Sequence, residues 1–166
     1  RGLQQYCECG RGGSEALLTM SVVSREPARK ALAQLLETDL VGTSKPVQAV
    51  YAYQVGDFQG QSPVVVVTSG PMERLRDTMG DCYRSRFNLM VYVFVLYADP
   101  GTAWGEDDAE DALDAIEAAI AETLLNNTRT ANWDRLSYSE ATAVDAVVIG
   151  GVEYRRELIT LTAEVL

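Results

Sequence analysis

The chain has 166 residues, of which 47% are hydrophobic and 23% are charged, and its formal net charge is −10. These proportions are ordinary for one globular domain. No apolar run approaches the roughly 20 residues that span a bilayer, so we expect no membrane partner. Binding of nucleic-acid phosphates depends on clustered Lys and Arg. The negative net charge therefore excludes a direct DNA-binding role, but it does not exclude a role next to DNA.

The first 19 residues differ from the rest of the chain. They hold Cys7, Cys9 and four of the thirteen glycines, show no clear period, and precede Met20. We interpret residues 1–19 as a disordered or non-native tail whose removal leaves the fold intact, ahead of a single domain over residues 20–166. The Cys7-x-Cys9 spacing is too close for the usual zinc pattern, so we expect neither a metal nor a cofactor.

An amphipathic helix is predicted near the start of this domain. Ser24 can cap it, Pro27 suits its first turn, and the pattern ends before Gly42. Apolar residues recur at helical spacing at Ala28, Ala31, Leu32, Leu35 and Leu36.

Three strands are expected to follow. Val47–Val55 alternates in hydrophobicity, and Gly56–Ser62 is typical of a turn. Val64–Thr68 is apolar on both faces, which indicates a strand that is buried on both sides or paired at an interface. Phe87–Tyr97 has the same character and predicts a central strand.

Between the last two strands, Ser69–Arg84 is the least ordered-looking internal segment because it contains Gly70-Pro71 and Gly80-Asp81. We expect a protruding hairpin tip or a long loop there. This segment and the residues just after it contain the basic residues Arg74, Arg76, Arg84 and Arg86.

A second amphipathic helix is predicted over Glu106–Asn127, with acidic residues crowding its first turns, where the helix dipole favours them. Its outer face, which includes Glu110, Asp114 and Glu117, has no basic partner on the same helix. Two interpretations stay open: a solvated helix face, or a surface that contacts the arginine-bearing segment of a neighbouring copy.

The chain is predicted to end in a β-hairpin. Val144–Ile149 and Val152–Leu166 flank Gly150-Gly151, and glycine accepts the positive φ that tight two-residue turns require. The second strand is long, and its apolar alternation changes face partway. A bulge near Arg156–Leu158 would reconcile the two halves.

Three consecutive residues of this strand, Tyr154-Arg155-Arg156, combine an aromatic and two cationic side chains. Arg156 shares a face with Tyr154, so we expect it to bind a carboxylate at the sheet edge or across a subunit boundary. Arg155 lies on the other face with Glu153 and Glu157, where we expect a weak, solvent-screened pairing.

Known catalytic signatures are missing from the sequence. It has no Gly-rich phosphate loop, no zinc-protease motif and no nucleophile elbow. It also lacks histidine, the commonest general base. The acidic cluster at 106–111 lacks the spacing of a calcium loop, and capping of the helix explains it. We therefore expect no enzymatic activity.

The order of these elements resembles the tail terminator, or tail completion, proteins of long-tailed phages and prophages. The resemblance covers nearly all of residues 20–166. The segments that carry it are Arg25–Leu36, Pro46–Tyr51, Leu89–Leu96, the acidic helix 106–126 and Tyr154–Arg156.

The resemblance implies an α+β subunit, with two amphipathic helices on a mostly antiparallel sheet, that closes into a hexameric ring. Such a ring would assemble in the host cytoplasm and lie at the tail–head junction of the virion. It would cap the tail tube protein, stop tube growth and present its other face to the head–tail connector or neck protein. DNA would pass through an acidic lumen without sequence-specific binding.

The candidate interface residues of this ring are Arg74, Arg76, Arg84, Arg86, Glu110, Asp114, Glu117, Tyr154, Arg155 and Arg156. Two alternatives remain, a neck or head–tail connector completion protein and a small ligand-binding or enzymatic α+β domain.

Overall fold

The structure is a computed structural model, and it describes residues 23–76, 83–99, 101, 103–141 and 144–165. The expected tail at residues 1–19, with Cys7 and Cys9, lies outside these residues, as does Cys82. The elements in chain order are α1 (Arg25–Leu40), β1 (Ala49–Tyr51), β2 (Val64–Arg76), β3 (Tyr83–Leu96), α2 (Glu106–Asn126), β4 (Arg135–Ala141), β5 (Asp145–Ile149) and β6 (Val152–Val165).

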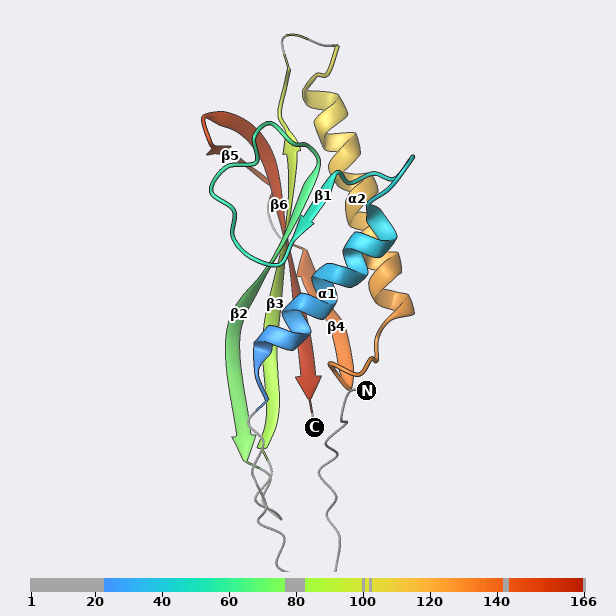
Figure 1. Cartoon of the computed structure of the whole chain (residues 1–166), viewed down its shortest axis with the longest axis vertical. Helices are drawn as coiled ribbons and strands as arrows, with labels where there is room; N and C mark the ends of the chain where they lie inside the picture. The colour runs from blue at the N-terminus through green and yellow to red at the C-terminus, as the bar shows by residue number, and fades with distance from the viewer. Residues whose placement is uncertain (1–22, 77–82, 100, 102, 142–143, 166) are drawn as a thin grey trace, which may run out of the picture.

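The expected α+β class is confirmed: both helices cover one face of a six-stranded sheet (Figure 1). Strand order is β1-β2-β3-β6-β4, and β5 also pairs with β6. Only β1 and β2 run parallel among the paired strands that the structure describes; the other pairs are antiparallel. Among the described residues, neither helix contains an apolar stretch long enough to cross a membrane.

The first helix begins where the sequence predicts it. Ser24 Oγ accepts a hydrogen bond from the backbone N–H of Glu26 (3.2 Å), which satisfies one of the free donors at a helix start. Leu32 and Leu36 are fully buried against the sheet. The helix continues through Leu40, one turn beyond the segment whose period is clearest.

Two apolar clusters hold the layers together. The larger fills the space between helices and sheet, with Leu32, Val91, Leu113, Ile116 and Leu161 among its members. The smaller lies on the other face of the sheet, at the end near β5, and consists of Phe58, Val64, Val66, Phe94 and Tyr154.

The strand expected over Val47–Val55 is shorter than predicted, since β1 keeps only Ala49–Tyr51. The chain then leaves the sheet and brings Phe58 onto its second face. There the ring of Phe58 lies 5.0 Å from Phe94 and 5.4 Å from Tyr154, centroid to centroid. The segment after β1 is therefore a covering loop as well as a turn (Figure 1).

The expectation of a long loop over Ser69–Arg84 is wrong for most of its length, because β2 runs to Arg76 and β3 begins at Tyr83. Gly70 and Pro71 are absorbed where the β2–β3 register shifts between Ser69 and Met72. A bulge accommodates both residue types without ending a strand. β2 and β3 form the antiparallel strand pair of the expected hairpin, and residues 77–82 between them lie outside the described residues.

The C-terminal hairpin is confirmed, with Gly150 at φ +60° and Gly151 at φ +80°. The bulge predicted in β6 is absent from its pairing with β3, which is continuous from Tyr154 to Val165 among the described residues. On the other edge of β6 the register shifts twice. One shift lies between Tyr138 and Glu140 of β4, and the other lies between Ala141 of β4 and Asp145 of β5, which pair with Ile159 and Arg156 of β6. The apolar side chains of β6 change face along the strand because the loop after β1 covers its first part and the helices cover the rest.

One strand has no counterpart among the sequence predictions. β4 carries buried Leu136 toward the helices, and Trp133 is buried just before it. The indole Nε1–H of Trp133 donates to the carbonyl of Asn127 (3.1 Å), which fixes the connection from α2 to β4.

Candidate subunit interface

The predicted arginine cluster lies on the β2–β3 hairpin, at the end of the sheet far from the start of α2 (Figure 1). Arg74 and Arg84 are exposed, and neither forms an ion pair with another described residue. Arg86 lies 3.8 Å from the carboxylate of Glu164 on β6. The side chain of Arg76 is not described; its backbone pairs with Tyr83.

The acidic face of α2 has a partner elsewhere in the chain. Arg155 Nε donates to Glu110 Oε1 at 2.6 Å, which joins β6 to the helix. The hydroxyl of Tyr138 donates to Glu117 Oε1 at 2.5 Å, which joins β4 to it. Asp114 between them is exposed. Two of the three predicted acidic candidates therefore already bind within the subunit.

Glu157 is the unusual carboxylate of this region. It is 8% exposed, and no described residue forms an ion pair with its carboxylate. Burial, and then the negative charges of Glu117, Asp114 and Glu110 on α2, raise the pKa of the Glu157 carboxyl. Burial and like charges both disfavour the ionised form of this side chain.

The two adjacent arginines are divided between the two faces of β6, as predicted. Arg156 forms two bonds to Asp145 on the edge strand β5, from Nε at 2.9 Å and from Nη2 at 2.6 Å. Its guanidinium carbon lies 5.8 Å from the centroid of the Tyr92 ring. The expected carboxylate at the sheet edge is confirmed. The expectation for Arg155 is wrong in its partner, which is Glu110 on α2.

Tyr154 is not a surface residue. It is fully buried in the smaller apolar cluster, and its hydroxyl has no hydrogen-bond partner among the described residues. Burial, with the nearby charge of Asp57, raises the pKa of this phenol. Tyr154 therefore supports the fold beneath Phe58 and does not present itself to a partner.

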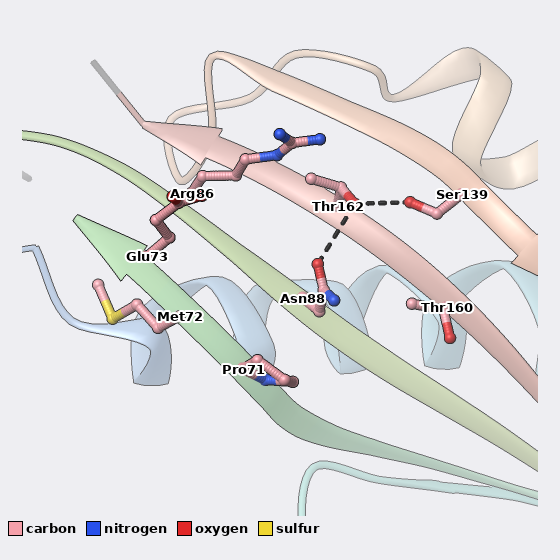
Figure 2. Close-up of a pocket in the computed structure, with 8 residues that line it drawn as sticks. All are labelled: Pro71, Met72, Glu73, Arg86, Asn88, Ser139, Thr160 and Thr162. Atoms are coloured by element: carbon pink, nitrogen blue, oxygen red, sulfur yellow. Dashed lines mark hydrogen bonds between the residues drawn. The ribbon is translucent and has the colours of Figure 1, made fainter. Parts of the chain in front are cut away.

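Beyond the smaller cluster, the sheet face opposite the helices is open and polar. A shallow hollow with a volume of about 420 Å³ lies on this face, between β2 and β4, and Figure 2 shows the residues that line it. Ser139 Oγ and Thr162 Oγ1 lie 2.6 Å apart, and Thr162 donates in turn to Asn88 Oδ1 at 3.3 Å. This chain of hydrogen bonds ties β4, β6 and β3 together across the open face.

A row of charged residues crosses the sheet at one end of this hollow. Glu73 on β2 pairs with Arg86 on β3, Arg86 pairs with Glu164 on β6, and Glu164 pairs with Arg135 on β4. Directly paired residues project from the same face of a sheet, so the signs alternate −, +, −, + from one edge to the other. Glu73 and Arg135 are the exposed ends of this charge row.

Both edges of the sheet lack a described partner strand at the height of the charge row, and we call them open in that sense, although the turn before β4 already occupies part of the β4 edge. Of the described strands, β1 reaches only Val64–Val66 of β2, so no described strand lies beside the rest of β2. Arg25 Nη1 donates to the Gly70 carbonyl there. β4 pairs only with β6 among the described strands, and the turn before it adds one bond, from Leu136 N–H to Thr128 C=O (2.8 Å).

Some of the interface residues predicted from the sequence lie next to one another in the structure, and others do not. The hairpin arginines and the acidic face of α2 stay separate within one subunit, whereas Arg155 and Glu110 meet. Sequence reasoning missed the open ends of the charge row, Glu73 and Arg135. The available signal for β4 was the alternation of Leu136 and Tyr138 with Ser137 and Ser139, which is typical of a half-buried strand. No group of three or more His, Cys, Asp or Glu side chains in the described ranges could hold a metal ion.

Together these features define an α+β domain with a covered sheet face, a polar sheet face and two open edges. No protein-family model and no curated protein sequence matches the chain. A solved structure titled "Virion of native gene transfer agent (GTA) particle" contains a chain that is similar over 84% of this chain and 90% of its own. The identity is 17% and the TM-score 0.40.

Proposed function

We propose that this chain is a structural subunit of a phage-like virion, a tail terminator that forms a ring on the end of the tail tube. In this proposal the ring stops tube growth and offers its other face for head joining. The subunit acts by assembly and performs no catalysis. It has six copies around an acidic lumen, and DNA passes through without sequence-specific binding.

The observation that carries the proposal is the pair of open edges on opposite sides of one sheet, β2 on one side and β4 on the other. A contact between two different surfaces of identical subunits is heterologous, and it repeats until the rotation closes a ring. The sequence resemblance to tail terminators supports the proposal that this ring belongs to a virion. The net charge of −10 suits a wall along which DNA slides.

A second candidate is a neck or connector completion protein, which would be a ring of the same kind with different neighbours. The two candidates differ in what the ring binds. A terminator binds the end of the tail tube and limits its length, whereas a connector protein binds the head portal side and leaves tube length unchanged.

The test is negative-stain imaging of the purified chain, alone and mixed with the tube protein of the same particle. We expect rings with a central hole, and rings seated on tube ends that grow no further. Rings that leave tube growth unaffected would favour the connector candidate. A chain that forms no rings in either sample would contradict both.

A further inference from the structure

We propose that a second copy of this chain docks on the sheet edge to edge, with β2 of one copy beside β4 of the next, so that Glu73 of the first meets Arg135 of the second. This inference deepens the proposed function and rests on its self-assembling subunit, because it names the two surfaces that would join. It requires neither a particular copy number nor a virion.

Strand direction favours this arrangement. β2 is antiparallel to β3, β3 to β6, and β6 to β4, so β2 and β4 run in opposite directions. When copies repeat around a common axis in one orientation, the next copy's β4 runs antiparallel to β2. The antiparallel alternation of the sheet then continues across the boundary. Backbone N–H and C=O groups can pair there, apart from the N–H of Leu136, which already donates to the Thr128 carbonyl.

The charge row supplies the complementarity. Inside one subunit Arg86 has an acidic neighbour on each side, Glu73 and Glu164. The row stops with unmatched charges at both edges, since neither Glu73 nor Arg135 forms an ion pair with a described residue. A second copy placed at the same height extends the −, +, −, + order without a break. Charges matched in this way set the register and exclude wrong partners.

Features of the β2 edge make the docking selective. Pro71 has no N–H to offer a neighbouring strand, a bulge shifts the register beside it, and Arg25 occupies the Gly70 carbonyl. These devices suppress indiscriminate strand pairing at sheet edges. The edge is therefore open on the Glu73 side of the bulge, where the charge row ends, and a partner must match that charge.

The experiment reverses each charge separately and then both together. Sedimentation velocity across a concentration series measures self-association of the wild type, Glu73→Arg, Arg135→Glu and the double variant Glu73→Arg/Arg135→Glu. We expect each single variant to associate about tenfold more weakly, or worse, because like charges then face each other between copies. We expect the double variant, and an equimolar mixture of the two single variants, to recover.

The double variant separates assembly from folding. Inside the subunit it keeps both like-charge pairs that the single reversals create, one between position 73 and Arg86 and one between position 135 and Glu164, so recovery can come only from the contact between copies. Glu37→Arg is the matched control, because it makes the same charge change at an exposed position of α1 and should associate like the wild type. Thermal melting verifies that every variant is folded.

Three outcomes would overturn the inference: a wild type that remains monomeric, a double variant that stays as weak as the single ones, or equal weakening by Glu37→Arg. Recovery of association without rings in the imaging experiment would leave the edge contact standing and contradict the ring subunit. Rings that form equally well with either charge reversal would support the ring subunit and contradict the edge contact.

Discussion

At the scale of single residues, the ionised side chain of Glu157 lowers the stability of the fold, and acidification removes this effect. Its folded pKa is raised above the unfolded value by burial and by Glu117, Asp114 and Glu110. Arg155 and Tyr138, the other charged and titratable groups at this junction, bind Glu110 and Glu117. A raised carboxyl pKa means that the folded state holds more protons than the unfolded state, so stability falls as pH rises between the two pKa values.

Glu157→Gln should therefore raise the melting temperature at pH 7, because an amide carries no charge to bury. The gain should shrink as the pH falls and vanish below the unfolded pKa of a glutamate, about 4.3, where the wild-type side chain is protonated in both states. Thermal melting of both proteins between pH 4 and 8 measures this. Asp107→Asn on the exposed start of α2 is the control. A variant that is less stable at pH 7 would contradict the prediction.

The two arginines of β6 offer a second test at this scale. Their side chains are 26% and 34% exposed, and the partners Glu110 and Asp145 are more exposed still. Solvent screening limits such pairs to about 1 kcal/mol or less, well under the cost of stranding a buried charge. The two-bond contact and the Tyr92 ring add about 0.5–1 kcal/mol for Arg156.

We therefore expect Arg156→Ala to destabilise the fold by about 1–2 kcal/mol and Arg155→Ala by about 1 kcal/mol or less. Urea unfolding of each variant gives both values. A loss above about 3 kcal/mol for either would mean that its partner carboxylate is left buried and unpaired. The reverse order would show that the link from β6 to α2 outweighs the link to β5.

At the scale of elements, the turn between β5 and β6 depends on two glycines for different reasons. Both have positive φ. A Cβ on Gly150 would lie 2.4 Å from Asp57 Oδ1, whereas a Cβ on Gly151 would meet no atom within 4 Å. Asp57 Oδ1 accepts the backbone N–H of Gln59 at 2.7 Å, so the turn packs directly against the covering loop.

Gly151→Ala should cost about 1–2 kcal/mol, the strain of a left-handed backbone with a Cβ. Gly150→Ala should cost about 1 kcal/mol more, because Asp57 must move and give up its bond to Gln59. Denaturant unfolding of this matched pair measures the difference. Equal losses would show that the covering loop yields freely and does not hold the hairpin.

Helices and the terminal hairpin were predictable because their signals are local. Apolar spacing and Ser24 mark α1, acidic first turns mark α2, and a Gly-Gly pair marks the β5–β6 turn. The extension of β2 was not predictable, because a Gly-Pro pair such as Gly70-Pro71 normally ends a strand. Here the pair lies in a bulge, and pairing with β3 continues beyond it. β4 was not predicted because the side chains on its outward face are serines. The side chains on its inward face are covered only when α2 is in place.

The candidate interface was predictable only as a set of residue types. The sequence shows clustered arginines and an acidic helix, but long-range register decides which charges meet. Arg155 joins Glu110 because β6 passes under α2, and Arg86 joins Glu164 because β3 and β6 are neighbours. Glu73 and Arg135 stand at opposite edges for the same reason, and no local pattern reveals it.

At the scale of the whole molecule, the subunit has the features of one that repeats. One sheet face carries the helices, the other is polar beyond the cluster around Phe58, and both edges remain open beside a charge row with unmatched ends. The helices therefore cover one face of the sheet, whereas its two edges lack a described partner strand. A closed assembly would satisfy both edges at once, which a dimer through one contact would not.

Native mass spectrometry of the purified chain over a range of concentrations tests the proposed ring most directly. We predict one closed species of fixed copy number, six, in equilibrium with monomer and with little in between, because closing the ring adds a contact that no open intermediate has. A chain that stays monomeric at the highest concentration, or that forms an open-ended ladder of dimers, trimers and longer species, would contradict the ring.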